Sequence, residues 1–146
     1  MDGLFGQIDV LYEAGARSFV FFSVPPLERT PLFIEQGTQA VIQVKSATLD
    51  YNNQLAARIK AFVKRYNSTS VEKENGALGL VRLFDTQKVF NTLLHNADAL
   101  GFTNVTGYAV PYENGTPTET TQIYPYKPVS SFFWLNSLHP VFTVHE

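Results

Sequence analysis

The chain has 146 residues, 45% of them hydrophobic and 16% charged, and its 11 Lys and Arg against 13 Asp and Glu leave a formal net charge of −2. These values are typical of one soluble globular domain. Nucleic acid is not an expected partner, because the sequence has no run of basic residues to neutralise phosphates. A membrane span is not expected, since no apolar stretch approaches the roughly 18 to 20 residues that cross a bilayer. A signal peptide is not expected either, because the first residues lack a basic segment.

Cysteine is absent and aromatic residues are abundant. With 0 Cys, the sequence has no disulfide, thiolate metal site or cysteine nucleophile, although this says nothing of the compartment. The 12 Phe, 7 Tyr and 1 Trp make up 14% of the chain and are concentrated at 19–22 and 131–134. Such large rings require burial or a ligand.

The start of the chain predicts a helix followed by a strand. Apolar residues recur at helical spacing over residues 4–14, and Gly15 follows where a left-handed cap belongs, so this segment is expected to be the tail of a longer helix. Residues 17–23 form a continuous apolar run that ends before Pro25. They predict a buried parallel strand.

The same alternation then repeats. An apolar stripe at spacings of three and four residues predicts one long amphipathic helix over residues 39–66. Residues 78–84 are apolar and predict a second buried strand. Asp85 then caps a further helix that runs to Leu100 and closes at Gly101.

The order helix, strand, helix, strand, helix predicts an α/β fold. Its two strands are expected to be adjacent, parallel and buried on both faces, joined by a right-handed crossover through the helix at 39–66. Residues 102–130 are rich in Gly, Pro, Asn and Thr without a usable period, and predict a long irregular loop. Because a doubly wound sheet needs about four to six strands, residues 1–146 are expected to form the C-terminal portion of a single larger domain.

The residue best suited to acid–base chemistry is His139, which lies between an aromatic cluster and Pro140. A histidine exchanges protons near neutrality, and the proline and the rings would restrict its loop. The alternative is a partly buried histidine that only bonds to the backbone. Two others compete for the role: His95 lies within a predicted helix, where a surface position is expected, and His145 lies next to the terminus.

The sequence gives weaker indications of other kinds of functional site. The three histidines have no spacing typical of a metal site and the glycines form no phosphate-binding motif, so neither a metal nor a cofactor is expected. Asp85 follows a strand, where doubly wound folds place functional groups, although a helix N-cap explains it equally well. Sequons at Asn67, Asn104 and Asn114, all in predicted loops, modestly favour glycosylation and a secreted parent protein.

Five blocks of sequence form an ordered series. They are Leu-Tyr-Glu-Ala-Gly-Ala-Arg-Ser-Phe-Val-Phe-Phe-Ser-Val-Pro-Pro at 11–26, Tyr-Asn-Asn-Gln-Leu at 51–55, Leu-Phe-Asp at 83–85, Gly-Phe-Thr-Asn-Val-Thr at 101–106 and Trp-Leu-Asn-Ser-Leu-His-Pro at 134–140. The series resembles the GDSL (SGNH) ester hydrolases, and most closely their fungal acetylesterase branch, carbohydrate esterase family sixteen. The likeness covers nearly the whole chain but corresponds only to the C-terminal part of that family's domain.

The resemblance implies a partial three-layer α/β/α sandwich of the SGNH (flavodoxin-like) type and a serine ester hydrolase. His139 matches the family's histidine, which activates the serine, and Asn136 stands where the family has an aspartate that orients the ring. An amide can hold an imidazole but does not stabilise imidazolium by charge. Another acid in place of the aspartate, or a backbone carbonyl that orients His139, is the alternative. The family's serine block and oxyanion blocks have no counterpart in this sequence, so the chain by itself is expected to be inactive.

We therefore expect the C-terminal part of a secreted ester hydrolase that acts on acetyl or other short acyl esters of carbohydrates. His139 is its expected general acid/base, and Trp134 and Phe133 are candidate substrate contacts. A lipase or aryl esterase of the same superfamily is an alternative. A non-catalytic carbohydrate-binding module is another, in which Trp134, Tyr124 and Tyr126 stack on sugars. The oligomeric state stays open.

Overall fold

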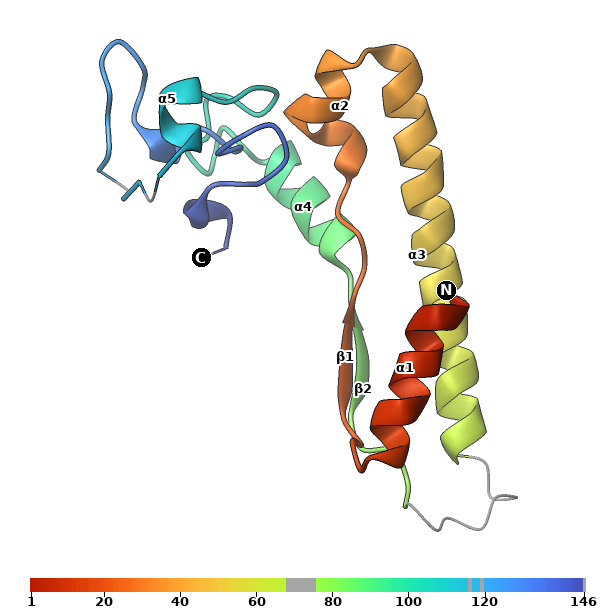
Figure 1. Cartoon of the computed structure of the whole chain (residues 1–146). Coiled ribbons are helices and arrows are strands. Elements are labelled where there is room, and N and C mark those ends of the chain that lie inside the picture. Colours follow the sequence, from red (N-terminus) through yellow and green to blue (C-terminus); the bar gives the residue numbers. More distant parts are fainter. Residues whose placement is uncertain (68–75, 116, 119, 146) are drawn as a thin grey trace. The chain divides into compact units, whose positions relative to one another are not determined.

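The computed structural model describes residues 1–67, 76–115, 117–118 and 120–145 (Figure 1). Five α-helices, three short 3₁₀ helices and two parallel strands make up the regular structure of these residues, which confirms the expected α/β class. The chain forms two compact units. Unit 1 consists of Met1–Val24 and Leu49–Thr86, and unit 2 of Pro25–Thr48 and Gln87–Glu146.

Unit 1 contains the sheet. Helix α1 (Asp2–Glu13) precedes β1 (Phe19–Phe22), and the long helix α3 (Thr38–Asn67) connects it to β2 (Val81–Phe84). The strands are adjacent and parallel, as expected. Both are shorter than the sequence predicts, because the pairing before them is irregular: the Ser18 hydroxyl, not a main-chain carbonyl, accepts the hydrogen bond from the Leu80 N–H at 3.3 Å.

One hydrophobic core holds unit 1 together. The predicted stripe of α3 packs with α1 on the same side of the two strands (Figure 1). Gly15, at φ +104°, follows α1 where the sequence predicts a left-handed position that suits glycine. The buried members of this core are Phe5, Ile8, Phe21, Leu55, Ile59 and Phe62.

The expectation that both strands are buried on both faces is wrong. In β1 only Phe21 is buried, whereas Val20 and Phe22 are 54% and 63% exposed. No residue of β2 is buried. The reason is that side chains alternate between the faces of a strand, and in the described residues α1 and α3 cover one face only.

Unit 2 contains short helices and irregular segments. The 3₁₀ helix η1 (Leu27–Arg29) and helix α2 (Pro31–Glu35) precede α3, and α4 (Thr86–His95) follows the sheet. The described residues of 102–130 are irregular as expected, apart from α5 (Val110–Glu113) and the start of η2 (Val129–Ser131). The 3₁₀ helix η3 (Phe142–Val144) follows later in the chain.

Helix α4 ends earlier than the sequence predicts. It stops at His95, and turns continue the chain to Gly101, which has a φ of +85°. Asn96 and Asp98 favour turns over helix, which explains the early end. None of the helices in the described part of the chain is long and apolar enough to cross a membrane.

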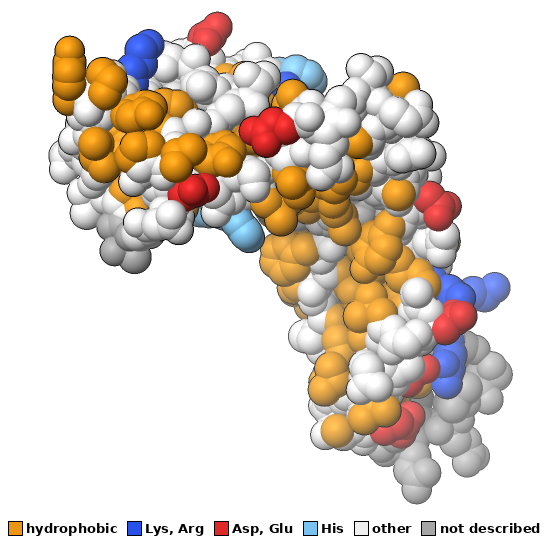
Figure 2. Space-filling model, turned by 45° about the horizontal axis from the view of Figure 1, so that its top comes forward, with side chains coloured by type: hydrophobic (Ala, Val, Ile, Leu, Met, Phe, Trp, Pro, Cys, Tyr) orange, Lys and Arg blue, Asp and Glu red, His pale blue; other side chains and the backbone are white. Residues whose placement is uncertain are grey.

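The core of unit 2 is rich in aromatic rings. It includes Phe133, Trp134 and Val141, which flank the loop of His139. Hydrophobic side chains also reach the surface of the molecule (Figure 2). The buried members of this core are Leu94, Ala97, Phe102, Ala109, Tyr112, Val129, Phe132, Phe133, Trp134 and Val141.

Candidate functional site

Main-chain hydrogen bonds fix the segment that carries His139. The Phe133 N–H donates to the Asn104 carbonyl at 2.9 Å, and the Val141 N–H donates to the Phe133 carbonyl at 3.0 Å. Between these points, the Leu135 N–H donates to the carbonyl of His139 at 2.8 Å and closes a tight loop. Main-chain bonds at Phe133 and Val141 thus anchor both ends of a loop whose tip, at Leu138 and His139, is exposed.

Asn136 and His139 form a side-chain pair at the tip of this loop. The Oδ1 atom of Asn136 accepts main-chain hydrogen bonds from Leu138 at 3.0 Å and from His139 at 2.8 Å. The same oxygen lies 3.1 Å from Nδ1 of His139. Because an amide oxygen can only accept, Nδ1 must carry the proton in the neutral ring. Nε2 is then the basic nitrogen.

This arrangement suits a general base. His139 is exposed, so a reactant can reach its ring. The hydrogen bond at Nδ1 selects the tautomer in which Nε2 accepts a proton, as the acid of a catalytic triad does. Asn136 orients the ring but carries no negative charge, so it stabilises the imidazolium that forms less than a carboxylate would.

A second segment supports the histidine loop within unit 2. The N–H of Leu32, in the first turn of α2, donates to the carbonyl of Ser137 at 2.8 Å. Arg29 in η1 donates to Oδ1 of Asn91 on α4 at 3.2 Å. Burial lowers the pKa of Arg29, and the negative charge of Glu28 opposes this shift. The η1–α2 segment is therefore bonded both to α4 and to the histidine loop.

The structure places the two rings considered as substrate contacts inside the core. Phe133 is 0% and Trp134 is 2% exposed, and the Trp134 indole Nε1–H donates to the Val105 carbonyl at 2.8 Å. Neither ring offers a face to a ligand in this structure. Tyr124 and Tyr126, considered as sugar-stacking residues, are 91% and 40% exposed.

The other candidate polar residues each have a different setting. Asp85 belongs to unit 1, at the N-cap position of α4, and its Oδ1 accepts a hydrogen bond from the buried Ser23 hydroxyl at 3.4 Å. His95 is the last residue of α4 and is exposed, as expected of a surface histidine. His145 follows η3 and is also exposed. In the described residues, no three His, Asp or Glu side chains form a group that could hold a metal ion.

The three sequons differ in setting. Asn67 is exposed at the last position of α3, not in a loop, and Ser68 and Thr69 lie outside the described residues. Asn114 is exposed and directly follows α5, and its Thr116 is likewise outside them. Asn104 is half-buried, and its Oδ1 accepts main-chain hydrogen bonds from Thr106 at 3.2 Å and Gly107 at 2.9 Å.

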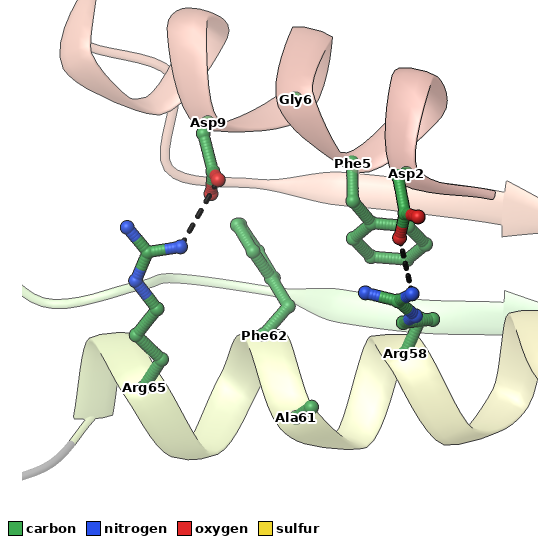
Figure 3. Close-up of a pocket in the computed structure, with 8 residues that line it drawn as sticks. All are labelled: Asp2, Phe5, Gly6, Asp9, Arg58, Ala61, Phe62 and Arg65. Atoms are coloured by element: carbon green, nitrogen blue, oxygen red, sulfur yellow. Dashed lines mark hydrogen bonds and ion pairs between the residues drawn. The ribbon is translucent and has the colours of Figure 1, made fainter.

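A pocket in unit 1 lies between α1 and α3 (Figure 3). Phe5 and Phe62 line it, and two ion pairs flank it. Arg58 pairs with Asp2, and Arg65 pairs with Asp9 at 3.0 Å. Because each guanidinium already has a carboxylate partner, these pairs link the two helices, and the pocket is not a ready anion site.

The sequence analysis did not predict two hydrogen-bonded contacts that the structure shows, one in each unit. Asn52 of α3 uses both ends of its amide on Val24: Oδ1 accepts from the N–H at 2.8 Å and Nδ2 donates to the carbonyl at 2.9 Å. The Leu32–Ser137 bond was also missed. Both join residues far apart in sequence, so no local spacing could signal them.

Comparison with known proteins shows which protein this chain is related to. No protein-family model matches the chain. The chain is similar to an acetylesterase of Thermothelomyces thermophilus, with 33% identity over 141 residues. This chain is a distant, partial-length homologue of a fungal acetylesterase. The alignment covers 96% of the chain and 38% of the acetylesterase.

Proposed function

We propose that this chain carries the histidine-bearing portion of a GDSL-type serine ester hydrolase that acts on acetyl or other short acyl esters of carbohydrates. In this proposal His139 is the general acid/base and Asn136 orients it. The serine nucleophile and the oxyanion donors come from polypeptide outside this sequence, within a three-layer SGNH sandwich. The observation that carries the proposal is the 3.1 Å contact between Asn136 Oδ1 and His139 Nδ1 on an exposed loop.

The homology supports the class of reaction. The matched relative is an acetylesterase, and the alignment includes almost all of this chain. Ester hydrolysis by a serine needs a base that takes the hydroxyl proton and later gives it to the departing alcohol. A histidine with Nδ1 held by an acceptor meets that need, since Nε2 is left to exchange the proton.

In the proposed reaction, Nε2 of His139 accepts the serine proton while the serine oxygen attacks the ester carbonyl. The protonated ring then donates that proton to the alkoxide, which leaves as the sugar alcohol, and an acetyl-serine remains. Nε2 then takes a proton from water as the water oxygen attacks the acetyl-serine. Acetate leaves, and the protonated ring returns the proton to the serine oxygen. Asn136 keeps the ring oriented through both stages.

The test is a chimaera that joins this chain to the part of the Thermothelomyces acetylesterase outside the matched region. The assay is acetate release from an acetylated sugar under steady-state conditions. His139→Ala should lower kcat by several orders of magnitude, because triad members act as a unit with the serine. Asn136→Ala should cost much less than the roughly 10⁴-fold loss typical of a triad aspartate, and Asn136→Asp should raise activity.

His95→Ala is the matched control, because His95 is another exposed histidine of unit 2. It should leave kcat unchanged. If His139→Ala and His95→Ala have the same kcat/KM as the parent chimaera, His139 is not the base. A preference for long acyl chains would instead favour a lipase or aryl esterase.

A second candidate function rests on Tyr124. Its side chain is 91% exposed in a turn that is closed by a hydrogen bond from the Tyr126 N–H to the Ile123 carbonyl at 2.9 Å. An exposed ring on an ordered turn is suited to stacking on a sugar. Sugar binding without hydrolysis, abolished by Tyr124→Ala and unaffected by His139→Ala, would favour a carbohydrate-binding module.

We also propose that the parent protein is extracellular and glycosylated. The exposed side chains of Asn67 and Asn114 support this. Expression of the chimaera in a fungal secretion host, followed by glycosidase treatment and mass measurement, tests it. An unchanged mass after treatment would contradict the proposal.

A further inference from the structure

The pocket between α1 and α3 in unit 1 has the size of a small-molecule site (Figure 3). Its volume is about 330 Å³, at the lower end of the range of about 300 to 1,000 Å³ in which small ligands bind. Four of its described lining residues come from each helix. The pocket is therefore built between two helices that a common core holds in place.

Charged residues recur along both helices and close the two ends of the pocket. Asp2 and Asp9 are seven residues apart on α1, and Arg58 and Arg65 are seven residues apart on α3. Seven residues are two helical turns, about 10 Å along the axis. Figure 3 shows one ion pair at each end, with the aromatic rings between them. The space between the pairs is long enough for one six-membered ring with its substituents.

Apolar groups form the middle of the pocket. Phe5 and Phe62 are 8% and 4% exposed, so their rings form its floor. Gly6 lines the pocket from α1, and a Cβ atom added there would meet no described atom of another element within 4 Å. Glycine inside a helix is destabilising relative to alanine. Here the missing side chain leaves the pocket open.

The charges of the pocket balance. Each end carries one carboxylate and one guanidinium, so the described lining has no net charge and favours neither an anion nor a cation. An entirely apolar ligand is also unfavourable, because it would remove these groups from water without replacing their hydrogen bonds. The lining suits a neutral molecule that has an apolar middle and hydroxyl groups at both ends.

Both ends offer donors and acceptors to such a molecule. A guanidinium has five N–H donors, and Arg58 gives one nitrogen to Asp2, whose side chain is 85% exposed. Such an exposed pair stabilises little, so its groups can bond to a ligand at small cost. At the other end, the Tyr66 hydroxyl donates to Oδ1 of Asp9 at 2.9 Å, and the Arg65 guanidinium lies 4.9 Å from the centroid of the Tyr66 ring. Groups that are already held in place cost a ligand less to order.

We infer that this pocket binds one ring of a neutral sugar, which packs its C–H groups on Phe5 and Phe62 and bonds its hydroxyls to the two ion pairs. A sugar ring has apolar faces that pack on aromatic rings, and its hydroxyls both donate and accept. The pocket belongs to unit 1 and His139 to unit 2, so the inference does not depend on the proposed catalytic role.

The test is ligand-detected NMR of this chain with methyl β-D-glucopyranoside as the probe. The parent chain should bind it saturably. D-glucuronate has a similar ring with a carboxylate and should bind no more tightly, because the charges of the pocket balance. The absence of saturable binding, or tighter binding of D-glucuronate, would overturn the inference.

Gly6→Leu should fill the pocket, and Gly3→Leu is its matched control. Both glycines lie on α1 with open space at the Cβ position, but Gly3 is not among the residues that line the pocket. Leucine favours a helix more than glycine does, so both variants should fold. Gly6→Leu should weaken binding of the methyl glucoside by at least about 10-fold, because its side chain takes the space of the ring. Gly3→Leu should bind as the parent does, and equal affinities of the two variants would refute the inference.

Arg58→Met tests the hydrogen bonds at one end. Methionine keeps an unbranched side chain and removes the donors, so the affinity should fall about 10-fold. Lys60→Met, which changes an exposed residue of α3 outside the pocket lining, should bind as the parent does. A parent-like affinity of Arg58→Met would contradict the inference. Acetate release plays no part in these readouts, so their failure is distinct from a failure of the proposed function.

Discussion

Replacing Trp134 with Phe should destabilise the protein, although an aromatic ring is kept. The indole is 2% exposed and its Nε1–H donates to the Val105 carbonyl at 2.8 Å. The six-membered ring of Phe can keep the contact with Phe133, whose ring centroid lies 4.9 Å from that of Trp134. The substitution therefore removes one hydrogen bond while keeping part of the packing.

The expected magnitude follows from that bond. Val105 is half-buried, so its carbonyl loses a partner in a place that water reaches poorly. Leaving a buried acceptor unsatisfied costs about 1 to 3 kcal/mol. For a chain of this size, each kcal/mol lowers Tm by about 2 to 4 °C, so the expected loss is about 2 to 12 °C.

The assay is urea denaturation of both proteins, followed by far-ultraviolet circular dichroism. Tyr124→Ala is the control, because that ring is 91% exposed and its loss should change the free energy of unfolding by less than about 0.5 kcal/mol. A Trp134→Phe protein with the parent's midpoint and slope would refute the structural role of the indole. Unchanged stability with weakened substrate binding would restore Trp134 as a substrate contact.

Two further predictions concern unit 1. Asn52→Ala should lower the free energy of unfolding by about 1 to 3 kcal/mol, because both main-chain groups of Val24 lose their amide partner. Asn53→Ala, on the exposed side of α3, should change the free energy of unfolding little in the same denaturation assay. Burial, and then a hydrogen bond to Asp9, raise the pKa of Tyr66 above its ordinary value. The folded state therefore favours neutral Tyr66, so its contribution to stability is complete below the unfolded pKa and is lost as pH rises through the folded one. Tm should fall with alkaline pH more steeply in the parent than in Tyr66→Phe, and equal slopes would contradict this.

The sequence predicts the elements of unit 1 well and their burial poorly. Short apolar runs separated by a long amphipathic helix indicate parallel strands, and β1 and β2 pair in that way. Burial depends on what covers each face, which a run of apolar residues does not specify. Phe22 and Phe21 are identical in type and adjacent in sequence, yet they are 63% and 8% exposed because they point to opposite faces.

In the candidate site too, the sequence predicts local contacts but not the burial or the contacts between distant segments. The spacing of three residues between Asn136 and His139 brings the two side chains together, because Asn136 folds back on the main chain of its own loop. Such local contacts follow from sequence. The support from Leu32 and the burial of Trp134 depend on segments far away in the chain, so residue type alone did not separate the buried Trp134 from the exposed Tyr124.

The most direct test of the proposed role of His139 is nitrogen-15 NMR of its imidazole in this chain at a pH where the ring is neutral. The hydrogen bond to Asn136 should hold the proton on Nδ1, so the chemical shifts should report Nδ1 as protonated and Nε2 as the basic nitrogen. In Asn136→Ala this preference should be lost, while His95 and His145 keep their parent spectra. A neutral His139 protonated on Nε2, or a tautomer that does not respond to Asn136→Ala, would contradict the arrangement on which the proposed function depends.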